Sequence, residues 1–288
     1  MSFKIITDST ADLPEMFVSE NNICVVNLSY SICDKTYCEE DLLSAKEFYS
    51  LMRQGNVPAT SQINPNQAKE ALLKAIEEND EILYISFSSA LSGSYNSARL
   101  AIEEILEDYP GKDIKLLDSK GASLGEGLMI YKAVNMRDNG ASLSEVYEYL
   151  SSHIDNFVHI FTVDDLNFLF KGGRVSKSTA IIGTVLNIKP ILHVDENGKL
   201  VPFDKVRGRK KALLFMVDEM EKRQGAFAKD NDVITISHAD CYEDASLLKD
   251  MIFERFGEKT VIINDVSPVI GSHSGPGTLA LFFMGYNK

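Results

Sequence analysis

The chain has 288 residues, 25% of them charged, and a formal net charge of −13 at pH 7, which is ordinary for a soluble globular protein. The negative charge disfavours binding to nucleic acid or to an anionic membrane surface, because both are polyanions. The apolar runs are too short to cross a bilayer and the first residues show no export signal, so we expect a cytoplasmic protein without a transmembrane segment.

The first half of the chain alternates short apolar runs with helical patterns, as a sheet of β–α–β units requires. The predicted strands are Lys4–Thr7, Cys24–Leu28, Ile82–Ile85 and Ile114–Leu117. Helix starts carry a capping side chain followed three residues later by Glu or Gln, at Ser44 with Glu47, Asn64 with Gln67, and Ser142 with Glu145. We expect an N-terminal α/β domain, residues 1–160, with a mostly parallel sheet.

The second half of the chain predicts a different sheet. Its strands are Phe157–Phe161, Pro190–Val194, Lys199–Pro202, Val233–Ile236 and Val261–Ile263. The turn at residues 195–198 favours an antiparallel hairpin. A glycine-broken pair of helices is expected within residues 164–187, and further helices around 210–222 and 244–256. We expect a C-terminal α/β domain, residues 161–288, with a mixed sheet.

Two clusters of small hydroxyl residues each stand before a predicted helix. They are Thr60-Ser61-Gln62 and Ser88–Ser94. Helix N-termini offer free N–H groups and a positive dipole end, so both clusters are candidate sites for a carboxylate or phosphate. Simple helix capping remains the alternative for either cluster. Five serines lie between Ser86 and Ser94, which is more than one cap requires.

Further candidate residues lie in turns and basic stretches. Asp8-Ser9-Thr10 follows the first strand, where it serves either as a helix cap or as a ligand contact. Lys171–Arg174 and Arg207–Lys211 are basic, and solvated charge is the simpler interpretation of both, although one inward Arg would pair with an anion. His273 lies in the glycine-rich stretch 271–277, which we predict to be a loop able to approach a ligand closely.

These segments together resemble the DegV family, to which the fatty-acid-binding subunits of bacterial fatty acid kinase belong. The resemblance covers nearly the whole chain, in the motifs DSTADLP (8–14), ATSQ (59–62), SSALSGSYNSA (88–98), FLFKGGRVSK (168–177), KVRG (205–208) and SHSGPGT (272–278). It implies two α/β domains with a long-chain fatty acid buried near their junction.

The resemblance also implies which residues hold the fatty acid. The implied residues are Thr60 and Ser92 for the carboxylate, Ser61 and Ser94 beside them, and Arg207 and His273 in the head-group neighbourhood. The chain departs from the family pattern at one place. Proline often directly follows TSQ in the family, whereas Ile63 and Asn64 stand between Gln62 and Pro65 here. Candidate aromatic residues for the acyl tunnel, which are more often plain core, are Phe157, Phe161, Phe168 and Phe170.

The resemblance predicts a carrier that presents its fatty acid to a separate ATP-dependent kinase. The patterns GxGxxG and GxxxxGKS are absent from the chain, so phosphoryl transfer would need that partner. No metal or cofactor is expected, since the four cysteines and the histidines lack ligand spacing. Two alternatives stay open. One is a serine hydrolase or acyltransferase with Ser92 as nucleophile, His273 as base and Asp8 as orienter. The other is a binding module for a non-lipid metabolite.

Overall fold

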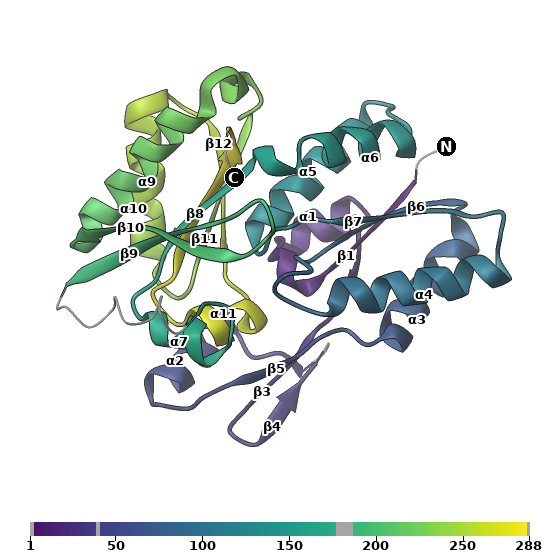
Figure 1. Cartoon of the computed structure of the whole chain (residues 1–288), viewed down its shortest axis with the longest axis horizontal. Coiled ribbons are helices and arrows are strands. Elements are labelled where there is room, and N and C mark those ends of the chain that lie inside the picture. The colour runs from purple at the N-terminus through teal and green to yellow at the C-terminus, as the bar shows by residue number, and fades with distance from the viewer. Residues whose placement is uncertain (1–2, 39–40, 177–186, 287–288) are drawn as a thin grey trace.

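The computed structural model describes residues 3–38, 41–176 and 187–286 (Figure 1). Within these ranges the strands form three sheets of four, six and three strands, which we name sheets A, C and B. The mixed α/β architecture predicted from the sequence is confirmed, with a parallel sheet A and a mixed sheet C.

Sheet A is built from the first half of the chain. Its strand order is β2-β1-β6-β7 and all its pairs are parallel, for β1 (Lys4–Asp8), β2 (Cys24–Val26), β6 (Glu81–Ser86) and β7 (Asp113–Asp118). The helices of this half are α1 (Glu15–Glu20), α2 (Ala45–Arg53), α3 (Pro65–Glu78), α4 (Ser94–Asp108), α5 (Leu124–Asp138) and α6 (Leu143–Ser152). The three predicted capping boxes are present at α2, α3 and α6, because each side chain there satisfies a free backbone N–H.

Sheet C has the order β10-β9-β8-β13-β11-β12. Its strands are β8 (Phe157–Thr162), β9 (Ile188–Val194), β10 (Leu200–Arg207), β11 (Val233–His238), β12 (Thr260–Asp265) and β13 (Leu279–Met284). The pair β11–β12 is parallel and the other pairs are antiparallel, including the predicted β9–β10 hairpin. The helices of this half are α7 (Leu166–Lys171), α9 (Arg209–Gln224), α10 (Tyr242–Phe256) and α11 (Pro268–Ser274). The second helix of the predicted glycine-broken pair falls at residues 177–186, outside the described residues.

Sheet B and strand β13 were not predicted. Sheet B is a small antiparallel sheet of β3 (Ser29–Ile32), β4 (Lys35–Tyr37) and β5 (Ala59–Ser61). Strands of three or four residues give little periodic signal, which is why they escape sequence analysis. Strand β13 is buried along its whole length between β8 and β11, so its sequence is uniformly apolar and does not alternate.

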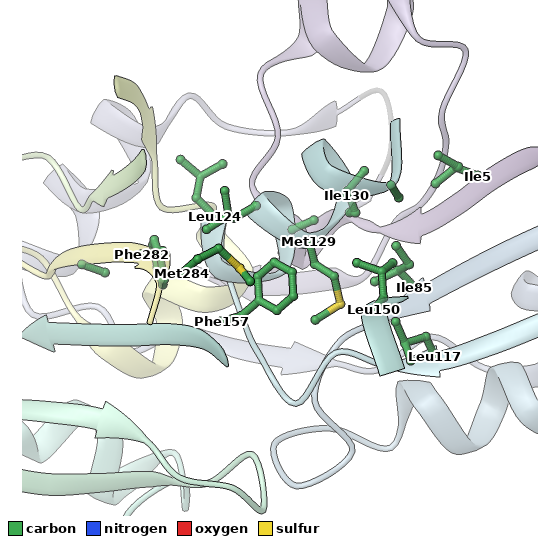
Figure 2. Close-up of a cluster of buried hydrophobic side chains, with 14 of the residues drawn as sticks. Ile5, Ile85, Leu117, Leu124, Met129, Ile130, Leu150, Phe157, Phe282 and Met284 are labelled. Atoms are coloured by element: carbon green, nitrogen blue, oxygen red, sulfur yellow. The ribbon is translucent and has the colours of Figure 1, made fainter. Parts of the chain in front are cut away.

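Sheets A and C share a hydrophobic core. Figure 2 shows side chains of α5, among them Leu124 and Met129, lying between those of the two sheets. The helix is buried nearly all round its first two turns, since it packs between the two sheets. Strand β8 already belongs to sheet C, so the strands change sheet before Phe157, slightly ahead of the predicted boundary at residue 160. The division into two domains remains a prediction. Among the described helices, none has the length and apolar character needed to cross a membrane.

Candidate ligand-binding cavity

A cavity of about 200 Å³ lies where the carboxyl edge of sheet A meets sheet C and α11. Loops that follow parallel strands meet at this edge, which is where open α/β sheets commonly bind ligands. Most of its lining is apolar. We use the name apolar wall for six of these residues: Leu28, Phe87, Leu91, Phe161, Val269 and Phe282.

Polar side chains from four separate segments also line the cavity. We call Thr60, Ser92, Arg174 and His273 the polar cluster. The first two are hydroxyl residues named by the sequence analysis, and His273 was named with them. The structure therefore brings together residues that lie up to 213 positions apart in the sequence. Thr60 belongs to β5, Ser92 to the loop before α4, Arg174 to the turn after α7, and His273 to α11.

The segment of Thr60 and Ser61 was wrongly predicted to stand at a helix start. Both residues belong to β5, where Thr60 pairs with Tyr30 of β3. Helix α3 begins at Pro65 behind its predicted cap, Asn64, so Thr60 and Ser61 lie outside its first turn. Side chains alternate along a strand, so Thr60 is half-buried and faces the cavity, whereas Ser61 is exposed and is not part of the lining.

The serine-rich loop between β6 and α4 follows the predicted strand and precedes the predicted helix. Most of its hydroxyls are used within the protein: Ser88 Oγ donates to Gly198 O at 2.9 Å, and Ser89 Oγ donates to Asp118. Ser94 Oγ accepts from Ile63 N and lies 2.9 Å from Ser92 Oγ. Ser92 is the serine of this loop that lines the cavity, and Ser94 lies outside the lining, hydrogen-bonded to Ser92.

His273 was predicted to lie in a loop, and this prediction is wrong. It lies on the short helix α11, which starts with Pro268 in its first turn and ends where Gly275 adopts a φ of +81°. Gly271 inside this helix is required by packing, since a Cβ there would collide with the Tyr49 hydroxyl. The helix presents Val269, Ile270, His273 and Ser274 to the cavity.

The electrostatics of the polar cluster are unusual for a site with two basic side chains. Burial and, secondly, the charge of Arg174 lower the pKa of His273 to about 4, so its imidazole is neutral at pH 7. Its Nε2 lies 2.8 Å from Thr60 Oγ1. Burial also lowers the pKa of Arg174, whose Nε donates to Leu91 O at 3.2 Å. A half-buried Arg174 is therefore the cation of this cluster.

Other predicted residues lie elsewhere. Arg207 is exposed at the end of β10 and does not line the cavity. Arg209 is the inward-turned arginine, paired with Asp244 and Asp164.

Asp8 is buried beneath the edge of sheet A, where its carboxylate accepts from Phe87 N at 3.0 Å. Burial raises the pKa of this carboxyl. Of the four candidate tunnel aromatics, Phe161 lines the cavity, while Phe157, Phe168 and Phe170 pack in or against the cores.

Some lining residues were missed by sequence analysis. Gln62 stands in the quoted ATSQ motif and contacts Gly93, where any Cβ would collide with its side-chain amide. Ser274 directly follows His273 in the motif SHSGPGT, where a serine beside a histidine carries no distinctive signal of its own. His159 lies on β8, where an isolated histidine in an apolar strand carries no distinctive signal. In the part of the chain that the structure describes, no three His, Cys, Asp or Glu side chains gather as metal ligands would.

Comparisons with known proteins identify relatives of the whole chain. A family model described as "Uncharacterised protein, DegV family" matches residues 2–285. A DegV domain-containing protein of Clostridium perfringens is 43% identical over 99% of this chain and 98% of its own length. A DegV lipid-binding protein of Thermotoga maritima has 31% identity and a TM-score of 0.85, with both chains fully covered. A DegV family protein of Thermus thermophilus, described by its fatty acid binding, has 29% identity and a TM-score of 0.86 over 99% of this chain and 100% of the other.

Proposed function

Because this chain belongs to the DegV family, we propose that it binds a long-chain fatty acid non-covalently and presents the carboxylate to a separate ATP-dependent kinase. The observation that carries the proposal is one cavity in which the polar cluster gathers beside the apolar wall. Solved relatives that bind lipid or fatty acid share the fold over the whole chain and support it.

The apolar wall suits an acyl chain. Burying about fifteen methylenes at ~0.8 kcal/mol each gives ~12 kcal/mol before the costs of ordering and association. Contacts along the tail therefore supply most of the affinity. A polar, non-lipid metabolite would bond to the polar cluster but would make no apolar contacts with the apolar wall, so we favour a lipid ligand.

The polar cluster suits the carboxylate. In our proposal Ser92 Oγ and Thr60 Oγ1 donate to the carboxylate oxygens and Arg174 balances the charge. A neutral His273 that donates from Nε2 to Thr60 Oγ1 leaves the Thr60 proton free for the ligand. Hydrogen bonds to a charged group are each worth about 1.5–3 kcal/mol, so these contacts fix the orientation of the fatty acid.

Presentation to a kinase requires that the carboxylate can be reached from outside. Ser61 and Gln62 are exposed beside Thr60, which places this side of the cavity close to the surface. The exposed Arg207 is free to meet a partner protein or to balance charge at the transition state. The chain lacks GxGxxG and GxxxxGKS patterns, which fits a carrier that depends on a partner for phosphoryl transfer.

The hydrolase alternative receives no support from the geometry. Hydrogen bonds among the described residues connect His273 to Thr60 and Ser92 to Ser94, and they join Asp8 to Thr10 and Phe87. A catalytic triad needs its base between the nucleophile and the orienting acid. Asp8 lies outside the cavity lining, and His273 Nδ1 has no hydrogen-bond partner among the described residues, so Asp8 does not orient this imidazole.

The first experiment tests binding itself. Protein purified from cells is extracted with organic solvent, and the released molecules are identified by mass spectrometry. We expect a fatty acid such as palmitate and no covalent adduct on Ser92. Repeated extraction without any acyl chain, together with no rise in melting temperature on adding palmitate, would make the carrier proposal wrong.

A second experiment tests presentation. Arg207→Ala is compared with wild-type protein in a reconstituted system containing the kinase and ATP. We expect acyl-phosphate production to fall more than equilibrium palmitate binding, because Arg207 lies outside the cavity lining. Equal losses in the two assays would instead assign Arg207 to the ligand site. If no kinase partner yields acyl phosphate, the chain carries lipid for another pathway.

A further inference from the structure

The cavity contains one hydroxyl that the protein itself does not use. Ser274, on α11, lines the cavity and is only 5% exposed. Its Oγ has no hydrogen-bond partner among the residues that the structure describes. A buried hydroxyl without a partner is costly, so its presence in a ligand cavity points to a group on the ligand.

Neighbouring hydroxyls show that α11 can satisfy its own serines. Ser272 Oγ donates to Pro268 O, four residues earlier, at 2.6 Å. Thr278 Oγ1 donates to Ser274 O at 3.0 Å and to Gly275 O at 2.8 Å. The equivalent bond from Ser274 to the carbonyl of Ile270 is not made, so Ser274 directs its hydroxyl elsewhere than its own helix.

The position of Ser274 limits where a ligand group would meet it. It directly follows His273, whose imidazole contacts Thr60 in the polar cluster. The two consecutive residues both line the cavity, so we infer that the Ser274 hydroxyl faces the part of the ligand next to the proposed carboxylate. An unsubstituted acyl chain offers only methylenes there.

We propose that Ser274 recognises a hydroxyl group on one of the first carbons after the carboxylate, so that the cavity takes 2- or 3-hydroxy fatty acids as a preferred ligand class. This inference rests on the proposed binding of fatty acids. It adds a specificity-determining contact that is separate from the polar cluster. Ser274 is able both to donate to and to accept from a ligand hydroxyl.

The test compares binding of four probes to delipidated full-length protein. They are hexadecanoate, 2-hydroxyhexadecanoate and the two enantiomers of 3-hydroxyhexadecanoate, each titrated calorimetrically. The quantity compared is the Kd of hexadecanoate divided by the Kd of each hydroxylated probe. For at least one hydroxylated probe we expect this ratio to fall about threefold to tenfold in Ser274→Ala, as the loss of one neutral hydrogen bond predicts.

Two further variants complete the design. Ser272→Ala is the matched control, because that hydroxyl is satisfied within the helix, and its ratio should equal that of wild type. Ser274→Thr keeps a hydroxyl and should retain most of the ratio. Circular dichroism and melting temperature establish that each variant is folded.

Two outcomes overturn the inference while leaving the proposed function intact. If Ser274→Ala weakens hexadecanoate and all hydroxylated probes equally, Ser274 contacts the carboxylate. If it changes the Kd of no probe, its hydroxyl makes no contact with the ligand. Failure of hexadecanoate and the hydroxylated probes to bind wild-type protein removes the proposed function, and the inference with it.

Discussion

The polar cluster and the apolar wall occupy the same cavity but are assembled differently. Each hydroxyl of the polar cluster stands in a short motif with a second hydroxyl outside the cavity lining, as Thr60 stands beside Ser61 and Ser92 close to Ser94. The apolar wall draws single residues from segments next to both sheets, such as Phe87, which follows β6 of sheet A, and Phe161 of β8 in sheet C. In the proposed function, the orientation of the ligand therefore depends on the directions of a few polar side chains, whereas its affinity depends on the summed area of the apolar wall.

The first prediction concerns the apolar wall. If its apolar area supplies most of the affinity, then shortening the ligand from sixteen to twelve carbons removes four methylenes and about 3 kcal/mol. That corresponds to roughly a hundredfold rise in Kd. Calorimetric titration with hexadecanoate and dodecanoate checks this. Equal affinity for the two acids would show that the polar cluster dominates binding.

The second prediction concerns the stability of the polar cluster. His273 has a pKa of about 4 in the folded protein, against about 6.5 in an unfolded chain. Between these values the unfolded state binds a proton that the folded state does not, so the free energy of unfolding falls as pH drops through this window. Across this window the titration of His273 changes the free energy of unfolding by about 3 kcal/mol. His273→Gln should remove this part of the pH dependence.

The measurement is urea unfolding between pH 7.5 and pH 4, with wild type and variant compared at each pH. A comparison is needed because Asp12 titrates in the same range with the opposite sign. Burial raises the pKa of Asp12 to about 7, so its contribution lowers the free energy of unfolding as pH rises toward 7. Parallel pH profiles for the two proteins would contradict a neutral, buried His273.

More residues of the polar cluster than of the apolar wall could be predicted from the sequence, and the reason is physical. Motif residues such as Ser92 and His273 are recognisable because a hydroxyl excess or a glycine-flanked histidine is uncommon. Phe282 and Val269 look like any core residue, and only the packing of β13 and α11 brings them to the cavity. The strands of sheet A and five of the six strands of sheet C were predicted from the sequence, whereas β13 and the three-residue β5 were not.

The third prediction separates the serines of one loop. Ser92→Ala removes a proposed hydrogen bond to the carboxylate and should weaken palmitate binding by about 2 kcal/mol without unfolding the protein. Ser89→Ala is the matched control, since Ser89 bonds Asp118 and lies outside the cavity lining. Similar losses in both variants would mean that the loop acts through its shape. Labelling of Ser92 by a fluorophosphonate would instead favour the hydrolase.

The fourth prediction concerns the position of Thr60 and Ser61 in strand β5. A helix N-terminus would bring both hydroxyls toward one anion, whereas the alternation along β5 turns Thr60 toward the cavity and Ser61 to solvent. Ser61→Ala should therefore change palmitate affinity by less than about 0.5 kcal/mol, as exposed substitutions usually do. Thr60→Ala should weaken binding clearly, because it also removes the partner of His273 Nε2. Comparable losses in the two variants, measured in the same titration, would mean that β5 rearranges when the ligand binds and that the helix-start interpretation holds for the bound state.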